Sequence, residues 1–347
     1  MRRQAGQLSV AAQGLKFTSF AVGGGTPLIL DEGQLEELFC LAELFGVHPS
    51  RVFTSVETSP EYTQKSVLRQ LRARGVERLS MGVQSFNETE LKKLKRRPGL
   101  GTVVGALENI VEAGFPQFNL DLIYGIEGQT VESFMRSLNT ALTYRPNELF
   151  IYPLYVRPGT RIDVRSTDDI GYAIYKSARE LLVGQGFVQT SMRRFVRRET
   201  TETEFSCGDE VMLSCGAGGR SYLGNLHYAT PYAVRQQAIA DEIGHYIRTT
   251  DFMTAANGFL LSTEEMQIRF IIKNLMYHRG VDLAEYEKRF GEKPDRNLFR
   301  EFTDRGWIEE TGRIVRLTEE GMAYSDYIGQ AFISPAVRKL MSEYVYP

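Results

Sequence analysis

Hydrophobic and polar positions alternate with two different periods along the first half of the chain. Short runs that are typical of buried strands occur at 16–22, 51–58, 77–86, 118–126 and 147–156. Each run is followed by a segment whose apolar residues recur every three or four positions, as on one face of a helix. Strands that alternate with helices over short connections predict right-handed βαβ units and a parallel sheet, either doubly wound or part of a barrel.

The carboxyl ends of these strands carry the residues of clearest chemical interest. In both architectures, ligands collect at this edge of the sheet. Glycines 23–25 follow the first strand, and they suit either a close approach of the backbone to a ligand or a tight turn. Glu57 ends a strand, and Asp121 lies within an apolar strand, where a carboxylate costs free energy unless it is paired. Together with Gln84, these side chains are either ligand contacts or structural hydrogen-bond partners.

The second half of the chain is less regular. Residues 171–186 have helical spacing, and 187–198 predict a strand. The polar, Gly-rich segment 199–231 predicts an irregular connection, and loops of that length are commonly functional or disordered. Helices resume from Ser262, and residues 305–318 predict a hairpin between helices, which is the pattern of a winged helix.

Two groups of basic residues could bind anions. Four arginines on the predicted strand 187–198 are Arg193, Arg194, Arg197 and Arg198. Alternation along a strand places Arg194 and Arg198 on one side, where the pair could bind substrate carboxylates, or the strand could be a solvated edge. The basic run at 92–97 is typical of a solvated helix face.

Composition and charge narrow the function classes. The 347 residues include 41 Lys+Arg and 43 Asp+Glu, and the net charge of −2 argues against a bulk nucleic-acid binder. No apolar run approaches the roughly 18 residues that a membrane span needs. Three cysteines, Cys40, Cys207 and Cys215, cannot build a disulfide framework, so we expect a cytoplasmic protein. Neither the cysteines nor the four histidines have the spacing of a metal site.

Several segments taken in order are more specific than any one of them: GGGTP (23–27), VETSP (56–60), ERLSMGVQSFNETELKKLKR (77–96), FNLDLIYGIEGQT (118–130) and YPLYVRPGT (152–160). Together they resemble the radical S-adenosylmethionine (SAM) enzymes related to oxygen-independent coproporphyrinogen III oxidase. The resemblance implies an α/β fold, namely an incomplete (β/α)6 barrel that here lacks its first strand, and a C-terminal winged-helix-like α+β domain. The expected domains are a partial barrel at 1–165, a barrel extension with the Gly-rich connection at 166–261, and the winged-helix-like domain at 262–347.

The resemblance also implies roles for individual residues. Those that would contact the methionine end of SAM are Gly24, Gly25 and Thr26. Those that would contact the cluster-bound SAM, or a second SAM beside it, are Glu57, Gln84, Arg96 and Asp121. Positions near the adenine and the cavity are Ile123 and Tyr155. The candidates for binding carboxylate groups of the substrate are Arg194 and Arg198.

One departure from the family pattern concerns catalysis. The family holds a 4Fe–4S cluster through a CxxxCxxC motif ahead of GGGTP, and none of the 22 residues before Gly23 is a cysteine. Thiolates are the ligands that such clusters need. We therefore expect this chain alone to be inactive, and we interpret Met1 as an internal start or the start of a truncated gene model.

Two hypotheses about function remain. The first is a radical SAM oxidoreductase that acts on a small molecule, with a tetrapyrrole as the candidate. Its reaction would be oxidative decarboxylation of propionates or a related radical reaction, with an electron donor such as flavodoxin or ferredoxin. The alternative is a non-catalytic protein that binds haem or SAM. Neither hypothesis includes a nucleic-acid or membrane partner, and both leave open the exact substrate and any role of Cys207 and Cys215.

Overall fold

The computed structural model describes residues 1–96, 99–155, 168–197, 211–231, 233, 236–255 and 257–343. The chain divides into two compact units. The first unit consists of Met1–Val188, Val196–Cys207 and Gly244–Thr254, and the second of Gln189–Phe195, Gly208–Ile243 and Ala255–Pro347. The domain limits expected from the sequence, at 165 and 261, stay predictions.

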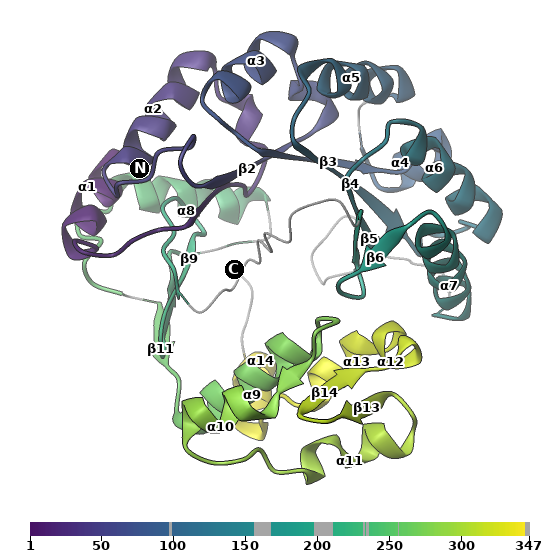
Figure 1. The fold of residues 1–347 in the computed structure, drawn as a ribbon. Helices are drawn as coiled ribbons and strands as arrows, with labels where there is room; N and C mark the ends of the chain where they lie inside the picture. The colour runs from purple at the N-terminus through teal and green to yellow at the C-terminus, as the bar shows by residue number, and fades with distance from the viewer. Residues whose placement is uncertain are drawn as a thin grey trace. The chain divides into compact units, whose positions relative to one another are not determined.

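A sheet whose first five strands are parallel forms the centre of the first unit (Figure 1). Its first strands pair in sequence order and are β1 (Ser19–Val22), β2 (Phe53–Thr58), β3 (Arg78–Gln84), β4 (Gln117–Tyr124) and β5 (Glu148–Pro153). The strands β7 (Arg194–Arg197) and β6 (Phe187–Gln189) complete the order β1-β2-β3-β4-β5-β7-β6. Because β1 and β6 are edges of this sheet, it is open, as an incomplete barrel requires. The prediction of one continuous strand at 187–198 is wrong, since residues 190–193 separate β6 from β7.

Helices cover one face of this sheet (Figure 1). They are α1 (Arg2–Ala11), α2 (Glu32–Glu43), α3 (Lys65–Ala73), α4 (Glu88–Lys93), α5 (Leu100–Ala113), α6 (Val131–Thr143) and α7 (Asp168–Gly184). Side-chain caps at Asp31, Asn87 and Thr130 satisfy amides at the starts of α2, α4 and α6. Gly114 ends α5 with a φ of 64°, a left-handed conformation that favours glycine. Helix α1 was not predicted from the sequence.

The two faces of the sheet differ in polarity. Along β2, β3, β4 and β5, the side chains toward the helices are apolar and almost fully buried, among them Val56, Leu79, Leu120 and Leu149. The opposite face carries a polar row, since the strand register places Glu57, Ser80, Asn119 and Glu148 side by side across the sheet. Helices on one face and a polar opposite face favour part of a barrel over a doubly wound sheet, whose two faces would both be apolar.

The second unit contains a small antiparallel sheet of order β11-β10-β9-β8. Its strands are β8 (Val211–Met212), β9 (Arg220–Leu223), β10 (Leu226–Ala229) and β11 (Gly258–Leu260). The prediction of an irregular connection at 199–231 is therefore wrong for residues 211–231, while 199–210 lie outside the described residues. The two-residue turn Gly224-Asn225 joins β9 to β10, and Gly224 has the positive φ of 64° that such hairpin turns require.

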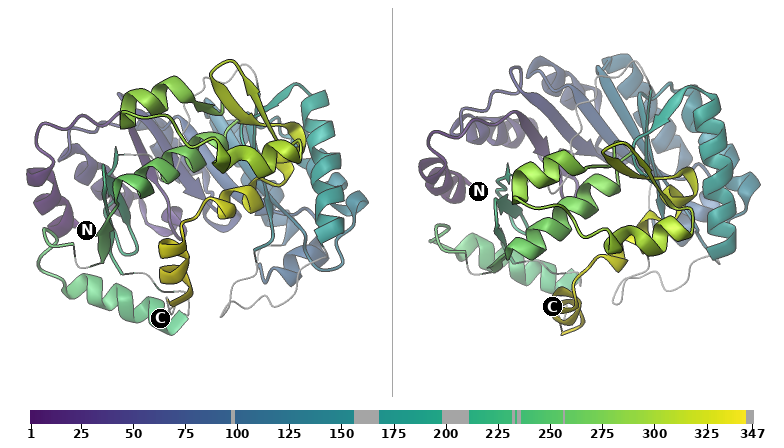
Figure 2. Two further views of the ribbon diagram at one scale, coloured as in Figure 1. Left: turned by 90° about the horizontal axis from the view of Figure 1, so that it is seen from below. Right: turned by 60° about the horizontal axis from the view of Figure 1, so that its bottom comes forward.

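The C-terminal part of the second unit has the predicted winged-helix-like arrangement (Figure 2). Its helices include α9 (Thr263–Leu275), α10 (Leu283–Phe290) and α11 (Asn297–Asp304), followed by α12 (Glu319–Ala323), α13 (Ser325–Ala331) and α14 (Pro335–Glu343). The predicted hairpin is present as β13 (Ile308–Thr311) and β14 (Ile314–Leu317), and β12 (Val281–Asp282) pairs with β14. The remaining helix, α8, spans Gln236–Arg248. No helix in the described part of the chain is long and apolar enough to cross a membrane.

Candidate ligand-binding site

A glycine turn and a carboxylate meet at the carboxyl ends of β1 and β2. Gly24 and Gly25 have φ values of 80° and 72°, which side-chain-bearing residues rarely adopt. The Gly24 amide donates to Glu57 Oε2 at 3.3 Å. A Cβ on Gly23 would lie 2.9 Å from the Glu57 carboxylate carbon, so the missing side chain lets this carboxylate rest directly against the backbone. Glu57 is exposed, and its negative charge is held beside a turn that a ligand can approach closely.

Gln84 ends β3 in an unusual backbone conformation. Its φ is 72° although it is not a glycine, and the pairing of β3 with β4 shifts register between Gly82 and Gln84. Such a bulge re-aims a side chain, and the backbone cost must be offset by its surroundings. The Gln84 amide turns back over Gly82, where an added Cβ would lie 2.5 Å from Nε2. Gly82 therefore makes the space that the buried Gln84 side chain occupies.

Asp121 lies on the polar face of β4, directly opposite Gly82 in the strand register. Asn119 Nδ2 donates to Asp121 Oδ1 and to Ser80 Oγ, both at 2.7 Å. Burial is the largest influence on this carboxyl and raises its pKa to about 7. The hydrogen bond from Asn119 and the charge of Arg78 act in the opposite direction, while the nearby carboxylates add to the rise. Asp121 can therefore exchange a proton near neutral pH.

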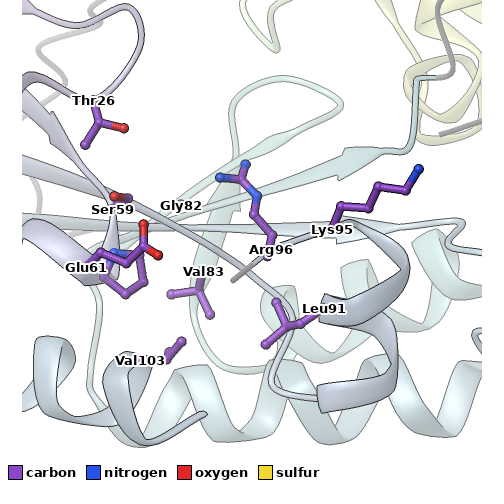
Figure 3. A pocket seen from close by; sticks show the side chains of 10 residues that line it. Thr26, Ser59, Glu61, Gly82, Val83, Leu91, Lys95, Arg96 and Val103 are labelled. Atoms are coloured by element: carbon purple, nitrogen blue, oxygen red, sulfur yellow. The ribbon is translucent and has the colours of Figure 1, made fainter. Parts of the chain in front are cut away.

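A pocket of about 220 Å³ opens beside these strand ends. Thr26, Ser59 and Glu61 lie on one side of it, and Arg96 and Lys95 on the other (Figure 3). The apolar side chains beneath them are Val83, Leu91 and Val103. Arg96 follows α4 and is exposed, so its guanidinium is available to an anionic group in the pocket. Of the predicted contacts, Thr26 and Arg96 line this pocket directly.

The remaining predicted residues of the first unit lie at the same strand ends. Ile123 packs against a small apolar cluster of Leu94, Ile126 and Leu154. Tyr155 follows β5 and has 49% of its surface exposed. These two residues could border a ligand on the side of β4 and β5, and their roles stay predictions.

The arginines proposed for substrate carboxylates do not form an open pair among the described residues. Arg194 is buried, with 7% of its surface exposed. Arg198 lies outside the described residues, as does Cys207. Arg193 pairs with Asp326 of the same unit at 2.5 Å, so it already meets a carboxylate of the chain itself. Substrate binding by Arg194 and Arg198 stays a prediction.

Several residues that the structure brings to this site were not predicted from the sequence. They are Ser59, Glu61, Gly82, Lys95 and Asn119. A glycine inside a predicted strand is a recognisable signal of a bulge or a close approach, and Gly82 carries it. Lys95 belongs to the basic run predicted to be a solvated helix face, but it lines the pocket. Its positive φ of 54° turns the chain after α4, and Arg96 lines the pocket as well. No comparable signal marked Asn119.

Replacing Gly82 with alanine should destabilise the protein by about 1–3 kcal/mol, because the new methyl group must displace the buried Gln84 amide. Gly105→Ala is the matched control, since Gly105 lies within α5 with no atom within 4 Å of an added Cβ. There, alanine should stabilise by about 0.5–1 kcal/mol through helix propensity. Urea unfolding followed by circular dichroism measures both changes. Equal effects of the two substitutions would contradict the close packing of Gln84 on Gly82.

Two family models match the chain. Residues 2–141 match the Radical SAM superfamily, and residues 261–324 match the HemN C-terminal domain. The chain belongs to the radical SAM family related to oxygen-independent coproporphyrinogen III oxidase. The radical SAM match covers β1 to β4 of the sheet and the helices from α1 to most of α6, and the second match covers most of the winged-helix-like part.

Named relatives of this radical SAM protein fall into two groups. The heme chaperone HemW of Bacillus subtilis is 27% identical over 334 residues, which cover 90% of this chain and 84% of the relative. The oxygen-independent coproporphyrinogen III oxidase of Salmonella typhimurium is 35% identical over 292 residues, which cover 78% of this chain and 62% of the relative. The solved coproporphyrinogen III oxidase (HemN) of Escherichia coli shares the fold, with a TM-score of 0.79 at 22% identity over 95% of this chain and 81% of that one.

Radical SAM family members bind SAM and a 4Fe–4S cluster. The two cysteines that the structure describes do not fit a cluster. Cys40 is exposed, while Cys215 belongs to the second unit and is half-buried, and burial raises the pKa of its thiol to about 11. Within the described residues, no group of three His, Cys, Asp or Glu side chains could hold a metal ion. The strand-end site does fit SAM, because it combines an exposed carboxylate at a glycine turn, a part-buried carboxyl and an arginine.

Proposed function

We propose that this chain binds SAM at the carboxyl ends of β1 to β4 and takes a tetrapyrrole as its second ligand, without cleaving SAM reductively by its own residues. The observation that supports SAM binding best is the Glu57 carboxylate seated on Gly23 and bonded to the Gly24 amide. An exposed carboxylate held beside a glycine turn suits the ammonium group at the methionine end of SAM.

The other charged groups of the site fit the remaining parts of SAM. Arg96, which lines the pocket beside these strand ends, would bind the carboxylate of SAM, because a guanidinium offers two parallel donors. Asp121, when ionised, would accept hydrogen bonds from the ribose hydroxyls, and Asn119 fixes the position of its carboxylate. Ile123 and Tyr155 would border the adenine. SAM supplies the adenosyl and methyl groups of the family's chemistry when bound.

The names of the relatives support a tetrapyrrole as the second ligand. One group of relatives is named for handling haem, and the other for oxidising coproporphyrinogen III. Both ligands are tetrapyrroles that carry propionate groups. The described cysteines, Cys40 and Cys215, offer no cluster site, and this favours the binding role over catalysis by this chain. The electron donor and the cytoplasmic location stay predictions.

Titration calorimetry of the purified chain with SAM tests this assignment. We expect Glu57→Gln and Asp121→Asn each to weaken SAM binding by about 10–100-fold, since a hydrogen bond to a charged group contributes about 1.5–3 kcal/mol. The matched control is Glu112→Gln, which removes a carboxylate from the exposed end of α5. Unchanged SAM affinity in both site variants, or no SAM binding by the unmodified chain, would refute the site.

A second candidate function is the oxidative decarboxylation of tetrapyrrole propionates. The 35% identity to the Salmonella oxidase favours it. The reaction needs a 4Fe–4S cluster, for which the described cysteines offer no site. Release of carbon dioxide from coproporphyrinogen III by this chain, under reducing anaerobic conditions with SAM, would favour this candidate over the binding role.

A further inference from the structure

The small antiparallel sheet of the second unit presents one row of unusual composition. The register pairs Met212 with Tyr222, Tyr222 with His227, and His227 with Phe259. Directly opposed residues of antiparallel strands share a face, so a thioether, a phenol, an imidazole and a phenyl ring lie side by side. We call these four residues the His227 row. Most of the surface of this row is apolar, and the imidazole of His227 is a side chain that commonly binds metals.

His227 is held in this row in a specific orientation. Its ring packs edge-on against Tyr222 with centroids 4.6 Å apart, and it lies 5.9 Å from the Phe259 ring. Only 7% of the residue is exposed. Its Nε2 is buried and has no hydrogen-bond partner in the described part of the chain, while the ring hydrogen-bonds to the backbone of Gly224. The hydrogen bond therefore uses the other nitrogen, Nδ1.

An unpartnered nitrogen in a buried ring needs an explanation, because most buried polar atoms are satisfied. Burial, and then the charge of Arg269, lower the pKa of His227, so the ring is neutral at physiological pH. A neutral imidazole with Nδ1 bonded to a backbone carbonyl and a free lone pair on Nε2 has the arrangement of a metal ligand with its supporting hydrogen bond. The His227 ring therefore has the protonation state and the orientation of a metal ligand that binds through Nε2.

The kind of metal centre follows from what surrounds the imidazole. A bare ion needs about four protein ligands, and no group of three His, Cys, Asp or Glu is present among the described residues. In haem, the macrocycle supplies four ligands to the iron, and the protein adds one or two. Tyr222 and Phe259 offer aromatic surface to a planar macrocycle. Arg269 lies over the Tyr222 ring at 4.9 Å, where a guanidinium could meet a propionate.

We propose that His227 Nε2 is an axial ligand of haem iron and that the His227 row forms the surface that holds the haem. This inference rests on the tetrapyrrole part of the proposed function and adds the site for it. Coordination donates the Nε2 lone pair to the iron and transfers no electron or proton. Because Nε2 is covered, haem enters only when a neighbouring side chain moves. Phe259 is suited to this, since it lies on an edge strand with 58% of its surface exposed.

Titration of the full chain with hemin, followed by the Soret band and by electron paramagnetic resonance, tests the proposal. We expect the unmodified chain to show an imidazole-ligated ferric spectrum. Both His227→Ala and the similarly sized His227→Gln should lose this spectrum and bind hemin about 10–100-fold more weakly, as loss of metal-site groups commonly does. The control His245→Ala removes an exposed histidine on α8 and should change neither readout.

Two further outcomes separate this inference from the proposed function. If the unmodified chain does not bind hemin, the tetrapyrrole part of the proposed function fails, and the inference fails with it. If His227→Gln binds hemin with an unchanged spectrum, only the inference fails. His227→Gly with added imidazole guards against an effect of misfolding, because the free ligand should restore the spectrum if His227 coordinates the iron. Failure of imidazole to restore it in a folded variant would overturn the assignment.

Discussion

Glu148→Ala is expected to lower the free energy of unfolding by about 3–5 kcal/mol, because it leaves a buried guanidinium without its counter-charge. Arg78 Nε donates to Glu148 Oε2 at 2.7 Å, with side chains that are 11% and 3% exposed. Arg78 Nη1 also donates to Ser55 Oγ at 2.9 Å, so the pair ties β2, β3 and β5 together across the polar face of the sheet. Urea unfolding followed by far-UV circular dichroism measures the change.

Comparison variants show whether the charge or the packing causes this loss. Removing both charges with Arg78→Met and Glu148→Leu should cost far less than Glu148→Ala, since paired apolar replacements of a buried ion pair are often neutral. The exposed pair Lys65–Glu112 provides the matched case, and Glu112→Ala should cost about 0–1 kcal/mol. A loss in Glu148→Ala no larger than that in Glu112→Ala would contradict the importance of this buried pair.

The parallel sheet could be predicted from the sequence because its signal is local. Each of the five expected strands contains one of β1 to β5, apart from the first residue of β4, and the structure shortens them at their ends. Helix caps such as Asn87 and Thr130 stood at recognisable positions before the helices that they begin. The edge of the sheet that carries the candidate site followed from topology alone, since the ends of parallel strands lie together.

The features that escaped prediction depend on contacts between distant positions. The Gln84 bulge needs the space above Gly82, which is visible only when the side chain is placed. The strands β8 to β11 are two to four residues long, too short for a period to emerge, and β11 joins the sheet from a separate segment. His227 was one of four scattered histidines in the sequence, and its importance depends on neighbours that the fold brings from β9 and β11.

The buried ion pair and the candidate SAM site are electrostatically linked. Arg78 lowers the pKa of Asp121, whereas Glu57 and Glu148 raise it, so the polar face of the sheet adjusts the proton affinity of a proposed ligand contact. The structural charges below the site therefore influence its binding chemistry.

SAM affinity is expected to rise with pH up to about pH 7 and to fall about tenfold per pH unit well below it. The pKa of Asp121 is raised to about 7 by burial, and only the ionised carboxylate accepts hydrogen bonds from both ribose hydroxyls. Calorimetry between about pH 5.5 and 7 stays below the range in which α-amino groups titrate, which is centred at about 7.7–8.0. Asp121→Asn should bind more weakly and show no such pH dependence, because its amide does not titrate.

The stability of the ligand-free protein should change with pH in the opposite direction. Because the folded-state pKa of Asp121 lies above its ordinary value of 3.8, the folded protein keeps a proton that the unfolded chain releases. The protonated Asp121 thus contributes to the free energy of unfolding at low pH, and this contribution is lost as pH rises toward 7. Comparing the chain with Asp121→Asn isolates this contribution. If SAM affinity and stability instead rise together with pH, the raised pKa of Asp121 is not the cause of either.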